Sequence, residues 1–120
     1  MDQWLGGAEK ALQGFLALPV NWDSYGARRI DPGTVDTGKQ LLSSFIPPGS
    51  PPPHVAPTSR GGIQIEWHTQ GIDLEIEVVS PDRLQIFYES PKEPEKEFEF
   101  NSPFADLRKF LEEKLPRMTR

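Results

Sequence analysis

Apolar and polar side chains alternate through residues 61–100, and this alternation constrains the fold of the chain more than any other feature. The alternating segments are Gly62–His68, Ile72–Val78, Arg83–Glu89 and Glu95–Phe100. Successive side chains of a β-strand point to opposite faces of a sheet, so the pattern predicts four strands with one apolar face and one acidic face. Turn residues at Thr69–Gly71 and Ser80–Asp82 make the first three strands an antiparallel meander, and a longer turn at Ser90–Pro94 leads into the fourth.

The apolar phase of these segments predicts the core of the protein. Its members are Ile63, Ile65, Trp67, Ile72, Leu74, Ile76, Val78, Leu84, Ile86, Tyr88, Phe98 and Phe100. We expect helices to cover this face, because an apolar sheet face must be buried against another layer.

Three helices are predicted from apolar residues that recur at three- and four-residue steps. The first covers Asp2–Leu18. Asp31 and Pro32 suit the N-cap and first position of a second helix, whose buried side extends to Ile46. Asn101–Pro103 suit the cap of a final helix. The apolar stripe of this last helix consists of Phe104, Leu107, Phe110, Leu111 and Leu115.

Six prolines between Pro47 and Pro57 predict an extended connector between helices and sheet. Proline cannot donate a ladder hydrogen bond, so we expect this connector along the sheet edge. The sequence therefore predicts one α+β domain of 120 residues, a four-stranded antiparallel meander with two N-terminal helices and one C-terminal helix packed on one face (α-α-β-β-β-β-α). Its parts are a helical part at 1–46, a proline-rich connector at 47–60, the sheet at 61–100 and the C-terminal helix at 101–120.

Charge is distributed unevenly along the chain. Residues 61–100 hold ten acidic and three basic side chains, whereas residues 1–60 hold five of each. A sheet this acidic repels phosphate groups, so the charge disfavours direct binding of nucleic acid. It favours a basic protein as the partner.

Composition excludes several other classes of protein. The chain has no cysteine, which rules out disulfides, thiolate metal sites and a cysteine nucleophile. No apolar run is long enough to span a bilayer, and no signal-peptide pattern opens the chain. We therefore expect a cytoplasmic protein without a membrane partner.

Hairpin turns at Gln70–Gly71 and around Pro81 predict the strand registers. Paired residue numbers sum to 141 across the first turn and to 162 across the second. The acidic face then carries three rows, which are His68–Asp73–Glu89, Glu66–Glu75–Phe87 and Gln64–Glu77–Gln85. Like charges directly opposite, such as Glu66 and Glu75, cost a few tenths to about 1 kcal/mol. The surplus of carboxylates fits a docking face, and it also fits a solvated face that resists edge aggregation.

The first functional hypothesis is a non-catalytic protein-interaction module of the antitoxin, immunity or adaptor type. Its partner-binding residues are Glu66, Asp73, Glu75 and Glu77, with Phe87 as an apolar anchor. The row containing His68 combines an imidazole with carboxylates, which suits a divalent metal or acid–base chemistry. A flat, exposed sheet face offers no cleft for either, so a surface histidine is favoured. We predict no metal site, no cofactor and no catalytic residue.

The second hypothesis places a small-ligand site or a minor enzyme activity at the loop Asn21–Ala27. The residues that it uses are Trp22, Asp23, Tyr25 and His68. The favoured alternative is a structural corner, in which Asp23 closes an Asx-turn, Gly26 takes a positive φ, and the two aromatic rings fill the junction between helices and sheet. A third hypothesis is a homo-oligomer formed through the apolar stripe of the first helix.

Two motifs resemble those of a recurrent group of small, uncharacterised bacterial proteins. They are Trp-Asp-x-Tyr-Gly at Trp22–Gly26 and Pro-Thr-x-x-Gly-Gly-Ile-x-x-Glu-Trp at Pro57–Trp67. The resemblance covers roughly residues 20 to 80. It implies a bacterial or phage origin and assigns no catalytic role.

Overall fold

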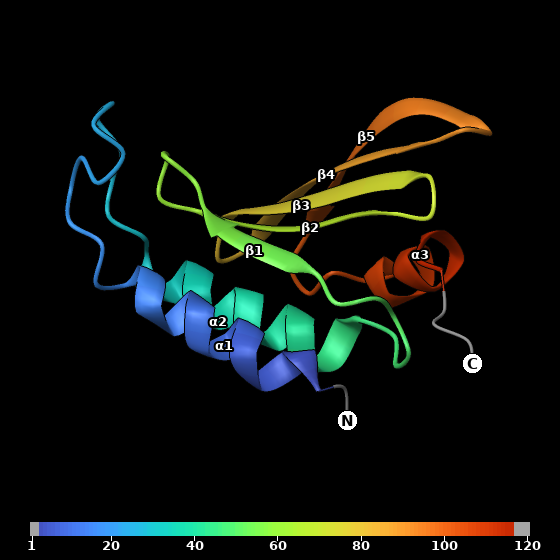
Figure 1. The fold of residues 1–120 in the computed structure, drawn as a ribbon, viewed down its shortest axis with the longest axis horizontal. Helices are drawn as coiled ribbons and strands as arrows, with labels where there is room; N and C mark the ends of the chain where they lie inside the picture. Colours follow the sequence, from blue (N-terminus) through green and yellow to red (C-terminus); the bar gives the residue numbers. More distant parts are fainter. Residues whose placement is uncertain (1–2, 117–120) are drawn as a thin grey trace.

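The computed structural model describes residues 3–116 and has two layers, a five-stranded antiparallel sheet and a set of helices beneath it (Figure 1). The strands follow chain order across the sheet: β1 (His54–Pro57), β2 (Ile63–Thr69), β3 (Ile72–Ser80), β4 (Arg83–Ser90) and β5 (Glu93–Asn101). The helical segments are α1 (Trp4–Phe15), α2 (Pro32–Gln40), the π-helical turn η1 (Leu41–Phe45) and α3 (Leu107–Lys114). The α+β class and the antiparallel meander are confirmed.

The sheet has five strands, so the prediction of four was wrong. The additional strand β1 lies within the proline-rich connector and pairs antiparallel with β2, from His54 opposite Glu66 to Pro57 opposite Ile63. Its place at the sheet edge leaves one side of the strand without ladder partners, where proline is tolerated. The indole Nε1 of Trp67 donates a hydrogen bond of 2.8 Å to the carbonyl oxygen of Pro51 and holds the connector beside the sheet.

The predicted registers are confirmed. Ile65 lies opposite Ile76 in the β2–β3 hairpin, as predicted. In the β3–β4 hairpin the paired residue numbers sum to 162, as predicted, except for Ser80 and Arg83 next to the turn. The structure adds the register of β5, which places Glu97 opposite Phe87 and Glu99 opposite Gln85. The alternating faces are therefore continuous across all five strands.

The apolar phase of the sheet forms the core against the helices. Nine of the twelve predicted residues are buried, and Ile72, Phe98 and Phe100 are half-buried. Phe110 of α3 covers the β5 end of this face, with its ring centroid 4.9 Å from that of Phe98 and 5.7 Å from that of Phe100. Side chains of α1, α2 and η1 cover the remainder.

The start of α2 is confirmed, whereas the start of the last helix was predicted wrongly. Asp31 is the N-cap of α2 and accepts a hydrogen bond of 3.0 Å from the backbone nitrogen of Gly33. The last helix begins only at Leu107, because Phe104 is buried ahead of it and packs edge-on against Phe45 at 6.1 Å. Phe104 and Asp106 both have positive φ, which is incompatible with a helix there.

All helical segments lie on the apolar side, so the opposite side of the sheet is left open (Figure 1). Within residues 3–116, no helix has the length and apolar character needed to cross a membrane. The apolar residues of α1 pack on the core, where Leu12 is fully buried.

Candidate functional site

The outer face is the side of the sheet turned away from the helices, and its side chains form rows across the strands. Continuous rows run through His54, Glu66, Glu75, Phe87 and Glu97, and through Ala56, Gln64, Glu77, Gln85 and Glu99. A shorter row contains His68, Asp73 and Glu89. The sequence-based list of partner-binding residues omitted Glu97 and Glu99. Their alternation with Phe98 and Phe100 was the signal that could have placed them here.

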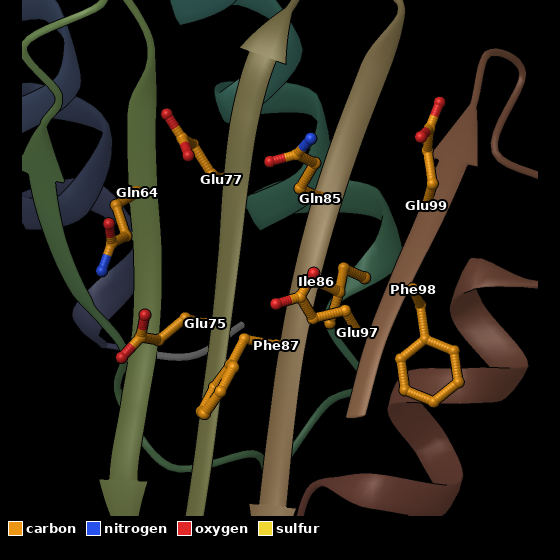
Figure 2. Close-up of a pocket in the computed structure, with 9 residues that line it drawn as sticks. All are labelled: Gln64, Glu75, Glu77, Gln85, Ile86, Phe87, Glu97, Phe98 and Glu99. Carbon is orange, nitrogen blue, oxygen red and sulfur yellow. The ribbon is translucent and has the colours of Figure 1, made fainter. Parts of the chain in front are cut away.

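A hollow of about 290 Å³ lies on this face around Phe87 (Figure 2). Its rim carries the carboxylates of Glu75, Glu77, Glu97 and Glu99 and the amides of Gln64 and Gln85. The half-buried ring of Phe87 lies between Glu75 and Glu97, its register partners on the two neighbouring strands. The expectation of a flat face was therefore wrong. Sheets twist, and side chains of unequal length on a twisted surface leave concavities that a residue pattern does not reveal.

Glu77 is already paired within the chain. Arg60 Nε donates to Glu77 Oε2 at 2.8 Å and Arg60 Nη2 donates to Glu77 Oε1 at 2.7 Å. The same Nη2 donates to Gln85 Oε1 at 2.9 Å. The hydrogen bond and the charge of Glu77 raise the pKa of Arg60 above its ordinary value. Two parallel charge-assisted bonds neutralise Glu77, so it is less available to a partner than its sequence position suggested.

His68 lies within a group of three carboxylates. Its Nδ1 is 2.6 Å from Asp73 Oδ1, and its Nε2 is 3.5 Å from Glu66 Oε1 and 3.8 Å from Glu75 Oε2. The hydrogen bond with Asp73 raises the pKa of His68 above its ordinary value; partial burial opposes this rise, and the negative charges of Glu66, Asp73 and Glu75 add to it. The predicted neighbours His68 and Asp73 are thus in contact.

Glu97 and Glu99 form no ion pair among residues 3–116. Both side chains are exposed. The outer face consequently has two electrostatic parts. Arg60 neutralises Glu77 and His68 contacts the carboxylates of Glu66 and Asp73, whereas Glu97 and Glu99 beside Phe87 form no ion pair within residues 3–116.

The Trp22 loop has the geometry of a structural corner. Asp23 Oδ1 accepts hydrogen bonds from the backbone nitrogens of Tyr25 at 2.8 Å and Ala27 at 3.1 Å, and Gly26 has φ +87°. Trp22 is half-buried, as expected of a ring that fills a junction. Tyr25 was expected to be buried as well, but it is 90% exposed.

The structure does not bring His68 to the Trp22 loop. The loop between α1 and α2 lies at one end of the molecule, and the β2–β3 hairpin that carries His68 lies at the other (Figure 1). Trp22, Asp23 and Tyr25 line neither the hollow around Phe87 nor a second hollow beside His54. The residues of the small-ligand hypothesis therefore do not form one site.

The fold and the site together define an α+β protein with helices on one side of its sheet and an open acidic face on the other. No protein-family model, curated protein or solved structure matches this chain. The resemblance to small bacterial proteins stays a prediction.

Proposed function

We propose that this chain is a non-catalytic protein-interaction module that binds a basic protein through its outer face. One observation carries the proposal: the hollow around Phe87 combines a half-buried aromatic ring with two carboxylates, Glu97 and Glu99, that form no ion pair within residues 3–116. Glu75 and Glu77 line this hollow from β3, and Glu66 and Asp73 lie next to Glu75 on the same face of the sheet. Antitoxin, immunity and adaptor proteins all act by binding another protein.

The chemistry of the hollow suits an arginine or lysine side chain of the partner. A guanidinium group can lie on the face of an aromatic ring and donate to flanking carboxylates at the same time. The cation–π contact with Phe87 contributes about 0.5–2 kcal/mol, depending on how far water is excluded. The surrounding negative charge speeds association and selects orientation more than it raises affinity.

Partner capture with matched variants tests this proposal. The immobilised chain is exposed to a lysate of the source cells, bound proteins are identified by mass spectrometry, and the purified partner is titrated calorimetrically. We expect a basic partner whose dissociation constant rises at least tenfold with Glu97→Lys/Glu99→Lys. Phe87→Ala should also weaken binding, without changing the net charge.

A control pair changes the net charge equally on the other layer of the molecule. Asp36→Lys/Glu113→Lys replaces exposed acids of α2 and α3, and we expect it to bind the partner as the unmodified chain does. Circular dichroism establishes that all variants are folded. A partner that binds both double variants equally well would contradict the proposal.

The small-ligand alternative has less support. The backbone already uses the Asp23 oxygen Oδ1, and the β2–β3 hairpin that carries His68 lies at the opposite end of the molecule from this loop. Homo-oligomer formation through α1 is likewise less favoured, because the apolar residues of α1 pack on the core of their own chain.

A further inference from the structure

We propose that Glu66, His68 and Glu75 form a binding site for a divalent first-row transition metal ion, with Zn²⁺ as the reference ion. The inference does not depend on the proposed partner. It concerns β2 and β3; Glu66 and Glu75 also belong to the proposed interface, whereas Phe87, Glu97 and Glu99 at its centre lie on β4 and β5.

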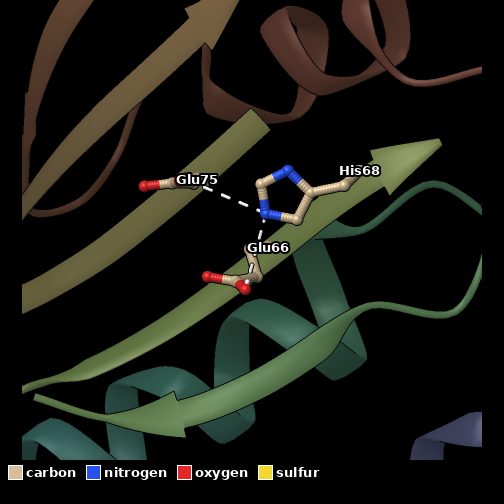
Figure 3. A group of neighbouring side chains, drawn as sticks. All are labelled: Glu66, His68 and Glu75. Atoms are coloured by element: carbon tan, nitrogen blue, oxygen red, sulfur yellow. Dashed lines mark ion pairs between the residues drawn. The ribbon is translucent and has the colours of Figure 1, made fainter. Parts of the chain in front are cut away.

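The donor atoms of these three side chains converge from two neighbouring strands (Figure 3). Glu66 and Glu75 lie directly opposite one another, and His68 follows Glu66 by two residues, so all three point to the outer face. One donor atom from each residue lies within 4.8 Å of the other two.

The spacing of the donors approaches that of an assembled site. Zinc bonds of about 2.0–2.1 Å in a tetrahedron place ligand atoms about 3.4 Å apart. His68 Nε2 is 3.5 Å from Glu66 Oε1 and 3.8 Å from Glu75 Oε2. These two distances exceed the ideal by only a few tenths of an ångström, and the donor oxygens of Glu66 and Glu75 lie within 4.8 Å of each other.

Asp73 orients the imidazole for this role. When His68 is neutral, Nδ1–H donates to Asp73 Oδ1 at 2.6 Å, which leaves the lone pair of Nε2 directed toward the carboxylates of Glu66 and Glu75. A carboxylate behind the ligating histidine is the usual second partner in metal sites, where it fixes the tautomer and raises the basicity of the ring. Asp73 is thus a positioning residue.

A second hollow supplies access and room for water ligands. It has a volume of about 380 Å³ and is lined by His54, Glu66 and His68, together with Pro51 and Pro52 of the connector. His54 Nδ1 lies 3.7 Å from Glu66 Oε1, the same oxygen that His68 approaches. Three protein ligands beside an open hollow leave a coordination position for water.

The donor set selects the class of ion. One imidazole and two carboxylates suit Zn²⁺ and its neighbours, whereas Mg²⁺ and Ca²⁺ prefer shells of oxygen alone. A dication would also offset the repulsion between Glu66 and Glu75, which face each other directly.

Calorimetric titration of the untagged, chelator-treated chain with Zn²⁺ tests the site. We expect one ion per chain, and a dissociation constant at least tenfold higher for His68→Gln and for Glu75→Gln. Asp73→Asn should raise it about 10–100-fold. Glu97→Gln/Glu99→Gln, which removes two nearby carboxylates outside the site, should leave it unchanged.

Three results would overturn the proposal: no saturable binding of Zn²⁺, equal binding by His68→Gln, or Mg²⁺ binding as tightly as Zn²⁺. Either of the last two results would mean that the carboxylates attract cations nonspecifically, without a defined coordination site. NMR of the histidine ring nitrogens tests the assignment of the ligand separately. The chain has two histidines, and we expect Zn²⁺ to shift the Nε2 resonance of His68 while its Nδ1 stays protonated. A shift at His54 alone would contradict the assignment.

Discussion

Single side chains of the outer face differ in how far their charges are compensated. Arg60 neutralises Glu77 through two short bonds, and Asp73 holds His68 through one. Glu97 and Glu99 have no such neighbour among the described residues. Substitutions at Glu97 and Glu99 therefore change the charge of the face without breaking an ion pair of the described residues, which makes them the most direct tests of binding.

The pKa of His68 is a measurable consequence of its surroundings. In the metal-free protein we expect an NMR titration to give a pKa above the usual value of about 6.5, and Asp73→Asn to lower it, because the hydrogen bond to Asp73 is the main cause of the rise. A pKa unchanged by Asp73→Asn would contradict this assignment.

The sign of the linked stability follows from the direction of the shift. A pKa that is higher in the folded than in the unfolded state stabilises the fold fully below the unfolded value, and this contribution is lost as the pH rises through the folded value. The pH range in which this contribution to stability is lost therefore begins at about 6.5 and extends upward. The His68 side chain is 47% exposed, so solvent screening keeps the contribution small.

At the scale of elements, glycines have opposite roles in α1 and at the start of β2. Gly6 lies on α1 with open space where a Cβ would be, so it only weakens the helix. A Cβ at Gly62 would lie 2.4 Å from the carbonyl oxygen of Val78, a backbone atom of the adjacent strand. Close approach between β2 and β3 therefore requires glycine there.

Gly62→Ala should destabilise the protein by about 1–3 kcal/mol, because β2 and β3 would have to separate at their paired ends. Gly6→Ala is the matched control and should stabilise by up to about 1 kcal/mol. Urea unfolding monitored by circular dichroism measures both free energies of unfolding. Equal effects of the two substitutions would show that the contact at Val78 does not constrain the strand.

The strands and helices also differ in how well the local sequence pattern predicted their bounds and registers. The β2–β4 registers were predictable because short turns tie each strand to the next. The length of the Ser90–Pro94 turn left the register of β5 open, although its alternation was plain. The strand β1 was missed because four residues ending in proline show no useful alternation. The start of α3 was missed because burial of Phe104 overrode a conventional capping sequence.

At the scale of the whole molecule, the layers predict a gradient of local stability. The strand β3 is paired on both sides and presents Leu74, Ile76 and Val78 to the core, where all three are fully buried. The edge strand β1 has four residues and one partner. Local opening requires less free energy where fewer buried contacts and ladder bonds are lost.

Hydrogen exchange measured by NMR should follow this gradient. We expect the amides of β3 to exchange slowest, near the rate set by global unfolding, and those of β1 to exchange orders of magnitude faster. The hydrogen-bonded amides of β2 and β4 should resemble β3. Protection of β1 equal to that of β3 would show that the proline-rich connector anchors the edge more firmly than its single ladder implies.

The sequence by itself determined which side chains share a face, because alternation in a strand is a local property of backbone geometry. It thereby established the apolar core, the acidic outer face and the contact of His68 with Asp73. The tertiary structure alone decided which distant segments meet. It paired β1 with β2, brought Arg60 to Glu77, and set Glu97 and Glu99 beside Phe87. It also hollowed the face and placed Glu66, His68 and Glu75 around one point, because twist and packing set the spacing of side chains in three dimensions.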